Sequence, residues 1–158
     1  MKSSSVAQGT ANESEQVESP CIKRKIVLVG NVGVGKSSII YRYTGTLRRN
    51  IIPIGTDFKL KCLTIGDELV QLQIWDMEGS HVPSRVFYRN AQAIVVVVEI
   101  NNINWKEEAS KWISESKRIG PAGVYFYLVA NKCDLVGDET KENEQNFIDF
   151  VEENSMKL

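Results

Sequence analysis

This sequence of 158 residues is poor in several features, and each shortage excludes a class of protein. Its three cysteines, Cys21, Cys62 and Cys133, are too few and too scattered for a disulfide framework or a zinc site. No apolar run is long enough to span a bilayer. The N-terminus has no apolar stretch of signal-peptide length and is not rich in arginine. We therefore expect a cytoplasmic protein in a reducing compartment.

The first 20 residues differ in composition from the rest of the chain. Residues 1–20 are mostly Ser, Gln, Glu, Asn and Thr, with almost no large apolar side chain. Such a segment cannot bury enough surface to offset its ordering entropy, so we predict a disordered tail. Residues 21–158 then form one domain, since a chain of this length is long enough for one domain and too short for two.

Short apolar runs alternate with helical stretches along the rest of the chain. This alternation predicts an α/β fold in three layers, with a mostly parallel sheet and helices on both faces. The predicted elements are buried strands at 26–29, 94–98 and 124–130, a hairpin of 58–65 and 70–75, and helices at 36–44 and 142–151.

A further helix is predicted before Gly120-Pro121, which should end it. Its apolar residues fall at helical spacing on one face, namely Trp105, Ala109, Trp112, Ile113 and Ile119. We interpret both tryptophans as core residues and not as part of a binding site.

A glycine-rich loop follows the first strand and opens the first helix. It reads GNVGVGKS and matches the pattern G-x-x-x-x-G-K-[ST]. Glycines let backbone N–H groups surround a phosphate, a lysine supplies a compact cation, and a serine hydroxyl is a hard ligand for Mg²⁺. The predicted nucleotide-binding residues here are Gly30, Asn31, Val32, Gly33, Val34, Gly35, Lys36, Ser37 and Ser38.

A second motif, Asn131-Lys132-Cys133-Asp134, stands directly after the predicted strand at 124–130. Ligands of open parallel sheets bind beyond the carboxyl ends of the strands, where both motifs lie. An Asp carboxylate accepts two N–H bonds from the Watson–Crick edge of guanine, which adenine cannot supply. Asn131, Lys132 and Asp134 are therefore the predicted base-binding residues.

With these two motifs, the sequence resembles the Ras superfamily, and the Rab branch in particular. Ile54–Phe58 (IGTDF), Gln71–Asp76 (QLQIWD) and Phe87–Ala91 (FYRNA) are similar to Rab segments. The resemblance implies the P-loop NTPase fold, GDP and GTP as ligands, Mg²⁺, and a switch that signals to membrane-traffic partners. It also implies that Lys36 holds phosphate and takes part in catalysis, that Ser37 and Asp76 hold the metal, and that Gly79 offers an N–H to the γ-phosphate.

The sequence departs from the family around the γ-phosphate. Pro53 stands where the family has a Thr that binds Mg²⁺, and Ser80 stands where the family has the Gln that orients the attacking water. Glu78 adds negative charge there, and Val32 would crowd an incoming group. Both switch segments are also shorter than in Rab proteins. These departures predict slow hydrolysis, with Ser80 as an impaired catalytic residue; the single histidine, His81, is a less expected substitute base.

The family continues with a further strand and helix beyond the point where this sequence stops, and then with a prenylated Cys tail. We therefore expect the fold without its last strand and helix, and only indirect association with membranes. Expected partners are protein effectors or regulators that contact the shortened switches, and no nucleic acid. Three interpretations stay open: a Rab-like switch with slow hydrolysis, a pseudo-GTPase that holds nucleotide structurally, and a truncated product.

Overall fold

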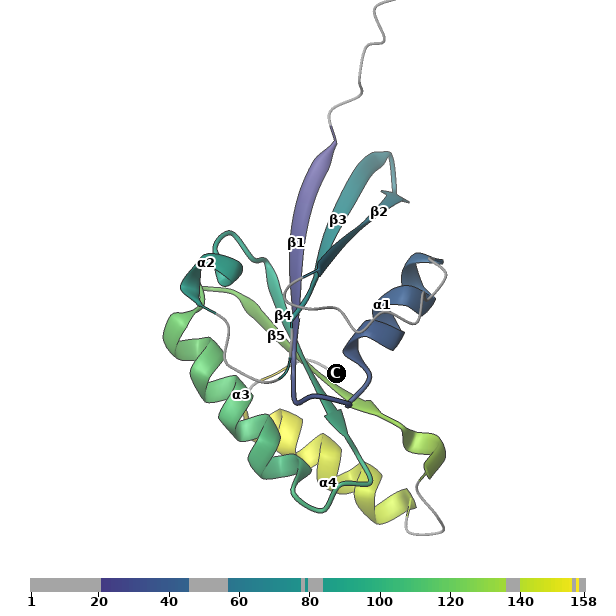
Figure 1. Cartoon of the computed structure of the whole chain (residues 1–158), viewed down its shortest axis with the longest axis vertical. Coiled ribbons are helices and arrows are strands. Elements are labelled where there is room, and N and C mark those ends of the chain that lie inside the picture. Colours follow the sequence, from purple (N-terminus) through teal and green to yellow (C-terminus); the bar gives the residue numbers. More distant parts are fainter. Residues whose placement is uncertain are drawn as a thin grey trace, which may run out of the picture.

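A single sheet of five strands forms the centre of the computed structural model, which describes residues 21–45, 57–77, 79, 84–135, 140–154 and 156. The strand order is β2-β3-β1-β4-β5. β2 runs antiparallel to β3, and all other neighbours are parallel. Figure 1 shows α1 on one side of this sheet and α2, α3 and α4 on the other. The predicted α/β fold, with a mostly parallel sheet and helices on both faces, is confirmed.

The strands are β1 (Ile22–Val29), β2 (Asp57–Ile65), β3 (Glu68–Asp76), β4 (Ala93–Glu99) and β5 (Tyr125–Asn131). β2 and β3 form the predicted hairpin, whose two-residue turn contains Gly66 at φ +60°. β4 lies inside the sheet, and its consecutive valines Val96, Val97 and Val98 are buried on both faces.

The helices are α1 (Lys36–Thr44), α2 (Arg85–Tyr88), α3 (Trp105–Ile119) and α4 (Thr140–Glu153), with a 3₁₀ turn at Cys133–Leu135. α1 ends at Gly45, which adopts the left-handed conformation common after helices. α3 ends at Gly120, whose N–H donates to the Ser116 carbonyl at 2.8 Å. Its predicted range is confirmed. The short helix α2 was not expected from the sequence. None of the helices among these residues is long and apolar enough to cross a membrane.

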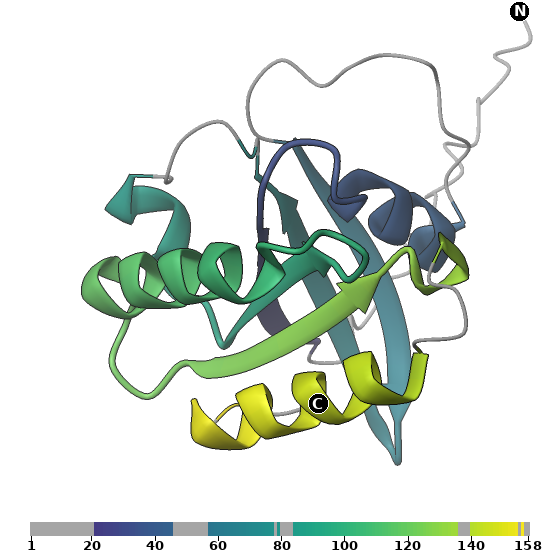
Figure 2. The ribbon, with the colours of Figure 1, turned by 90° about the horizontal axis from the view of Figure 1, so that it is seen from below.

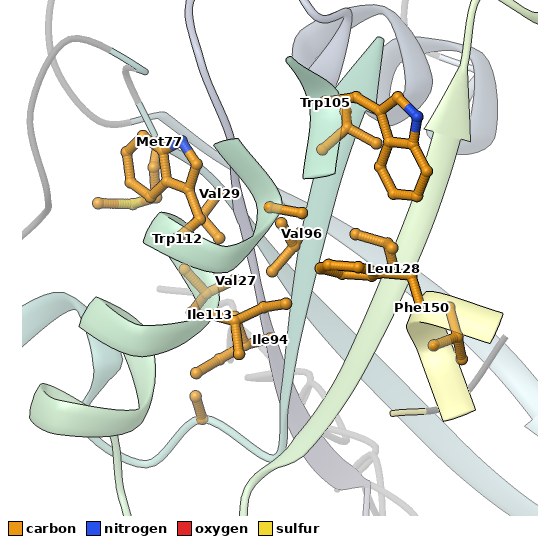
Figure 3. Packing of buried hydrophobic residues seen from close by; sticks show 14 of the residues in the cluster. Val27, Val29, Met77, Ile94, Val96, Trp105, Trp112, Ile113, Leu128 and Phe150 are labelled. Carbon is orange, nitrogen blue, oxygen red and sulfur yellow. The ribbon is translucent and has the colours of Figure 1, made fainter. Parts of the chain in front are cut away.

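A large apolar cluster fills the space between the sheet and helices α2, α3 and α4, and we call it the α3-side cluster (Figure 3). Trp105 and Trp112 are 5% and 3% exposed, so both belong to the core as predicted. Trp105 packs against Phe147 and Phe150, with ring centroids 5.6 and 5.3 Å apart, and thereby joins α3 to α4.

A smaller cluster lies on the opposite face, beneath α1, and we call it the α1-side cluster. Its buried members are Leu28, Val34, Ile40, Ile74 and Val97. Four strand residues around it are only partly buried: Ile26, Leu72, Val95 and Val129. Figure 2 shows α1 as the helix over this face in the part of the chain that is described.

Two strands differ from their predicted form. β1 begins at Ile22, four residues earlier than predicted, because Lys23, Arg24 and Lys25 pair with β3 through their backbone, which needs no apolar side chain. β5 was predicted to be buried, but Tyr125 is 57% exposed. Among the described strands β5 lies at the end of the sheet. The predicted disordered tail at 1–20 lies outside the described residues.

Candidate functional site

The two sequence motifs meet at one edge of the sheet. β1 runs into the glycine-rich loop 30–35, β3 ends at Asp76, and β5 ends at Asn131. These three strands are parallel, so their carboxyl ends lie at the same edge. The fold therefore brings together residues that are about a hundred positions apart in the chain.

At two positions of the loop the neighbouring residues leave no space for a side chain, so only glycine fits there. Gly30 has a φ of +142°, and a Cβ there would lie 2.2 Å from the Val97 carbonyl oxygen of β4. Gly35 has a φ of +101°, and a Cβ there would lie 2.2 Å from Nδ2 of Asn131. The loop is thus folded tightly against both β4 and the second motif, in a conformation that other residues rarely adopt.

Lys36 is enclosed by the loop that precedes it. Its side chain is buried, and its Nζ donates to the carbonyl oxygens of Gly30 and Asn31, both at 2.8 Å. Burial lowers the pKa of Lys36, and the charge of nearby Asp76 acts in the opposite direction. Asp76 is also buried. The site therefore holds a cation and a carboxylate close together beneath the loop.

The second motif is bonded directly to the loop. Nδ2 of Asn131 donates to the Val34 carbonyl oxygen at 2.7 Å. Lys132 has a φ of +59°, which is uncommon for a residue other than glycine, and its Nζ lies 2.5 Å from Oε2 of Glu99. Sequence reasoning missed Glu99. The parallel pairing of β4 with β5 places it opposite Asn131, and only the sheet register reveals this.

The remaining predicted residues differ in their surroundings. Ser37 is half-buried and Ser38 is exposed at the start of α1, while Asp134 is exposed in the 3₁₀ turn after β5. Gly79 packs on the loop, because a Cβ there would lie 2.4 Å from the Gly30 oxygen and the Val32 nitrogen. The predicted residues Pro53, Glu78, Ser80 and His81 lie outside the described residues.

Val32 carries the exposed side chain of the loop, next to the exposed Gly33. Its side chain is 70% exposed, although it is apolar and β-branched. Its neighbour Asn31 turns the other way, and its Oδ1 accepts a hydrogen bond from Nε1 of Trp112 at 2.8 Å. This contact between the loop and α3 was also missed, because nothing in the helical spacing of Trp112 indicates a polar partner.

A glycine loop between β1 and α1 that encloses a buried lysine defines a phosphate-loop α/β domain. A family model described as "Ras family" matches residues 25–157. The chain therefore belongs to the Ras family.

Several Rab proteins are similar to this chain. "Ras-related protein Rab-31" of Rattus norvegicus is 37% identical over 116 residues, which cover 70% of this chain and 60% of that protein. "Ras-related protein RABF2a" of Arabidopsis thaliana is 33% identical over 140 residues, which cover 85% of this chain and 70% of that protein. "GTP-binding protein YPT1" of Saccharomyces cerevisiae is 34% identical over 116 residues, which cover 70% of this chain and 56% of that protein. The chain thus spans about 60% of the length of Rab-31.

Proposed function

We propose that this chain binds GDP and GTP with Mg²⁺ as a Rab-like small GTPase and that it hydrolyses GTP slowly. The hydrogen bond from Asn131 to the Val34 carbonyl carries this proposal. It joins the base motif to the phosphate loop, so one ligand with a guanine at one end and phosphates at the other can contact both. In this proposal Asp134 accepts the guanine N–H groups, and the loop N–H groups and Lys36 bind the phosphates.

The residues present fit a magnesium ion. The described residues contain no group of three or more His, Cys, Asp or Glu side chains that would hold a metal by themselves. Mg²⁺ in nucleotide sites is instead held by one or two protein oxygens together with phosphates and water. Ser37 and Asp76 would supply the two protein oxygens. When bound, the ion would neutralise charge on the phosphates.

Among the described residues, Val32 is the one that supports the proposal of slow GTP hydrolysis. An apolar side chain exposed on the phosphate loop offers no hydrogen bond to water or to a developing charge. The substitutions Pro53 and Ser80 predict the same outcome from the sequence. An interaction module that holds nucleotide without turnover is the second candidate, and the same exposed valine favours it.

Protein partners in membrane traffic are part of the proposal. Phe58 and Leu60 of β2 are about half exposed, and Phe58 stacks on Trp75 with ring centroids 5.3 Å apart. Val86 of α2 is 65% exposed, and its neighbour Phe87 also contacts Trp75, with ring centroids 6.3 Å apart. Exposed apolar groups that adjoin one another are typical of protein contact surfaces. The three free cysteines support a reducing, cytoplasmic compartment.

The nucleotide content of the purified protein, measured after denaturation, tests the ligand. We expect bound GDP or GTP, and we expect Asp134→Ala to weaken guanine binding about a hundredfold by removing two charge-assisted hydrogen bonds. Asp67→Ala is the matched control, since Asp67 is exposed in the turn between β2 and β3. Figure 1 shows this turn at the end of the sheet opposite to the one where β1 leads into α1. Equal affinity for ATP and GTP would refute the proposal.

Single-turnover hydrolysis of bound GTP separates the two candidates. A slow but measurable rate supports a switch, and no turnover over days supports the interaction module. A fast rate in the wild-type protein would contradict both.

A further inference from the structure

One hydrogen bond links the phosphate loop to the middle of α3. Nε1 of Trp112 donates to Oδ1 of Asn31 at 2.8 Å, across 81 positions of the chain. Asn31 accepts a second hydrogen bond through its backbone, because its carbonyl oxygen accepts from Nζ of Lys36. Asn31 is thus held from two sides, by α3 through its side chain and by Lys36 through its backbone.

The α3 end of this bond is rigid. Trp112 is only 3% exposed, and Figure 3 shows its indole at the margin of the α3-side cluster. One helical turn later, Oγ of Ser116 lies 3.2 Å from the hydroxyl of Tyr88 in α2. Tightly packed side chains have few alternative rotamers, so the indole N–H is held in a fixed direction. A buried indole N–H needs an acceptor, and Asn31 supplies it.

The loop end of this bond is the Asn31 side chain, and among the described hydrogen bonds the bond from Trp112 is the one that holds this side chain. Loop residues 31–35 lie outside the regular strands and helices. Gly79 also packs against Asn31, since a Cβ at Gly79 would lie 2.4 Å from the Asn31 carbonyl carbon. Asn31 therefore contacts Gly79 through its backbone and Trp112 through its side chain.

We propose that Trp112 is a positioning residue that holds the phosphate loop in its binding conformation through Asn31 and thereby slows nucleotide release. This inference rests on the proposed function, because it assumes a guanine nucleotide in the site. Trp112 itself contacts no ligand in this proposal. A phosphate loop already held in shape loses less conformational freedom on binding, so the complex is tighter and dissociates more slowly.

The test measures dissociation of a fluorescent GDP analogue from the full chain loaded with Mg²⁺. Trp112→Phe keeps an aromatic ring in the cluster but removes the N–H, and Asn31→Ala removes the acceptor without touching the core. We expect each change to speed release about fivefold, as for the loss of one hydrogen bond. The double variant should also be about fivefold faster, and not about 25-fold, because both changes remove the same bond.

Tyr88→Phe is the matched control. It breaks a buried hydrogen bond between α2 and α3, the one between Tyr88 and Ser116, and leaves the bond from Trp112 to Asn31 in place. We expect it to lower the melting temperature to a similar degree as Trp112→Phe while release stays at the wild-type rate. The pair of variants separates positioning of the phosphate loop from a general loss of stability. A general loss of stability would speed nucleotide release in both variants alike.

Three results would overturn the inference alone: wild-type release from Asn31→Ala, fully additive effects in the double variant, or equal acceleration by Tyr88→Phe. If Trp112→Phe fails to fold, Asn31→Ala decides by itself, since its side chain lies outside both apolar clusters. A wild-type protein that binds no guanine nucleotide would overturn the proposed function as well. The wild-type measurement therefore distinguishes the two failures.

Discussion

The two faces of the sheet are packed to different degrees. Among the described residues, sixteen buried side chains form the α3-side cluster, whereas five form the α1-side cluster. The smaller cluster nevertheless includes Val34 of the phosphate loop and Ile40 of α1. The larger cluster reaches the loop through the Trp112–Asn31 bond. The two faces therefore differ in role: the α3 side supplies most of the buried apolar core among the described residues, and the α1 side packs directly against the site.

The largest effect is expected at Trp105 on the α3 side. Trp105→Ala should lower the free energy of unfolding by about 3–5 kcal/mol, because it leaves a cavity between α3 and α4. Urea unfolding followed by circular dichroism measures this. Ile103→Ala is the control, since Ile103 is 93% exposed and its loss should cost less than about 0.5 kcal/mol. Similar costs for the two variants would refute the assignment of Trp105 to the core.

Substitution of Gly30 tests how closely the phosphate loop packs against Val97, a residue of the α1-side cluster. Gly30→Ala should lower the free energy of unfolding by about 3 kcal/mol, because its Cβ would meet the Val97 carbonyl and its φ is positive. Gly123→Ala separates these causes. Gly123 also has a positive φ, but nothing lies within 4 Å of an added Cβ, so only about 1 kcal/mol is expected. Thermal melting of both variants gives the difference, and equal costs would mean that the close approach to Val97 is absent.

Substitution of two neighbouring valines of β4 gives the most direct comparison of how well the two faces are packed. Val96 is fully buried in the α3-side cluster, and Val95 points to the α1 side and is partly buried. Val96→Ala should cost about 2 kcal/mol, and Val95→Ala less than about 1 kcal/mol, because less apolar surface is returned to water. Parallel urea titrations measure both. The reverse order would show that the α1 side is the better packed face.

The smallest effect is expected from a polar change on the α1 side. Val129→Thr replaces a methyl group by a hydroxyl that water can reach, so its cost should stay within about 0.5 kcal/mol. The same change at Val98, which is 1% exposed, should cost about 1–3 kcal/mol, since the hydroxyl would be buried. Differential scanning calorimetry resolves the two. A large loss from Val129→Thr would mean that this side chain is shielded from water.

The elements with strong local patterns could be predicted from the sequence. The first helix at 36–44 and the helix before Gly120 match α1 and α3, because glycines mark their ends and apolar residues repeat at helical spacing. The start of β1 could not be predicted, since its charged residues pair through the backbone alone. α2 has only four residues, which is too short to produce a periodic pattern.

The candidate site was predictable in its motifs but not in its supports. The glycine loop and the Asn-Lys-x-Asp motif are local patterns, and each residue type follows from the chemistry of phosphate and base. Glu99 and Trp112 carry no such pattern. The first belongs to a strand and the second to an apolar helix face, where sequence reasoning expects a core residue.

The sequence by itself determined which residues are the candidates for binding phosphate and base, because the loop and base motifs depend on residue types at short, set spacings. Tertiary structure alone decided which residues hold them in place. The register of β4 with β5 sets Glu99 beside Lys132, and the packing of α3 on the sheet aims Trp112 at Asn31. These contacts span 33 and 81 positions, and contacts at such separations arise only when the whole chain has folded.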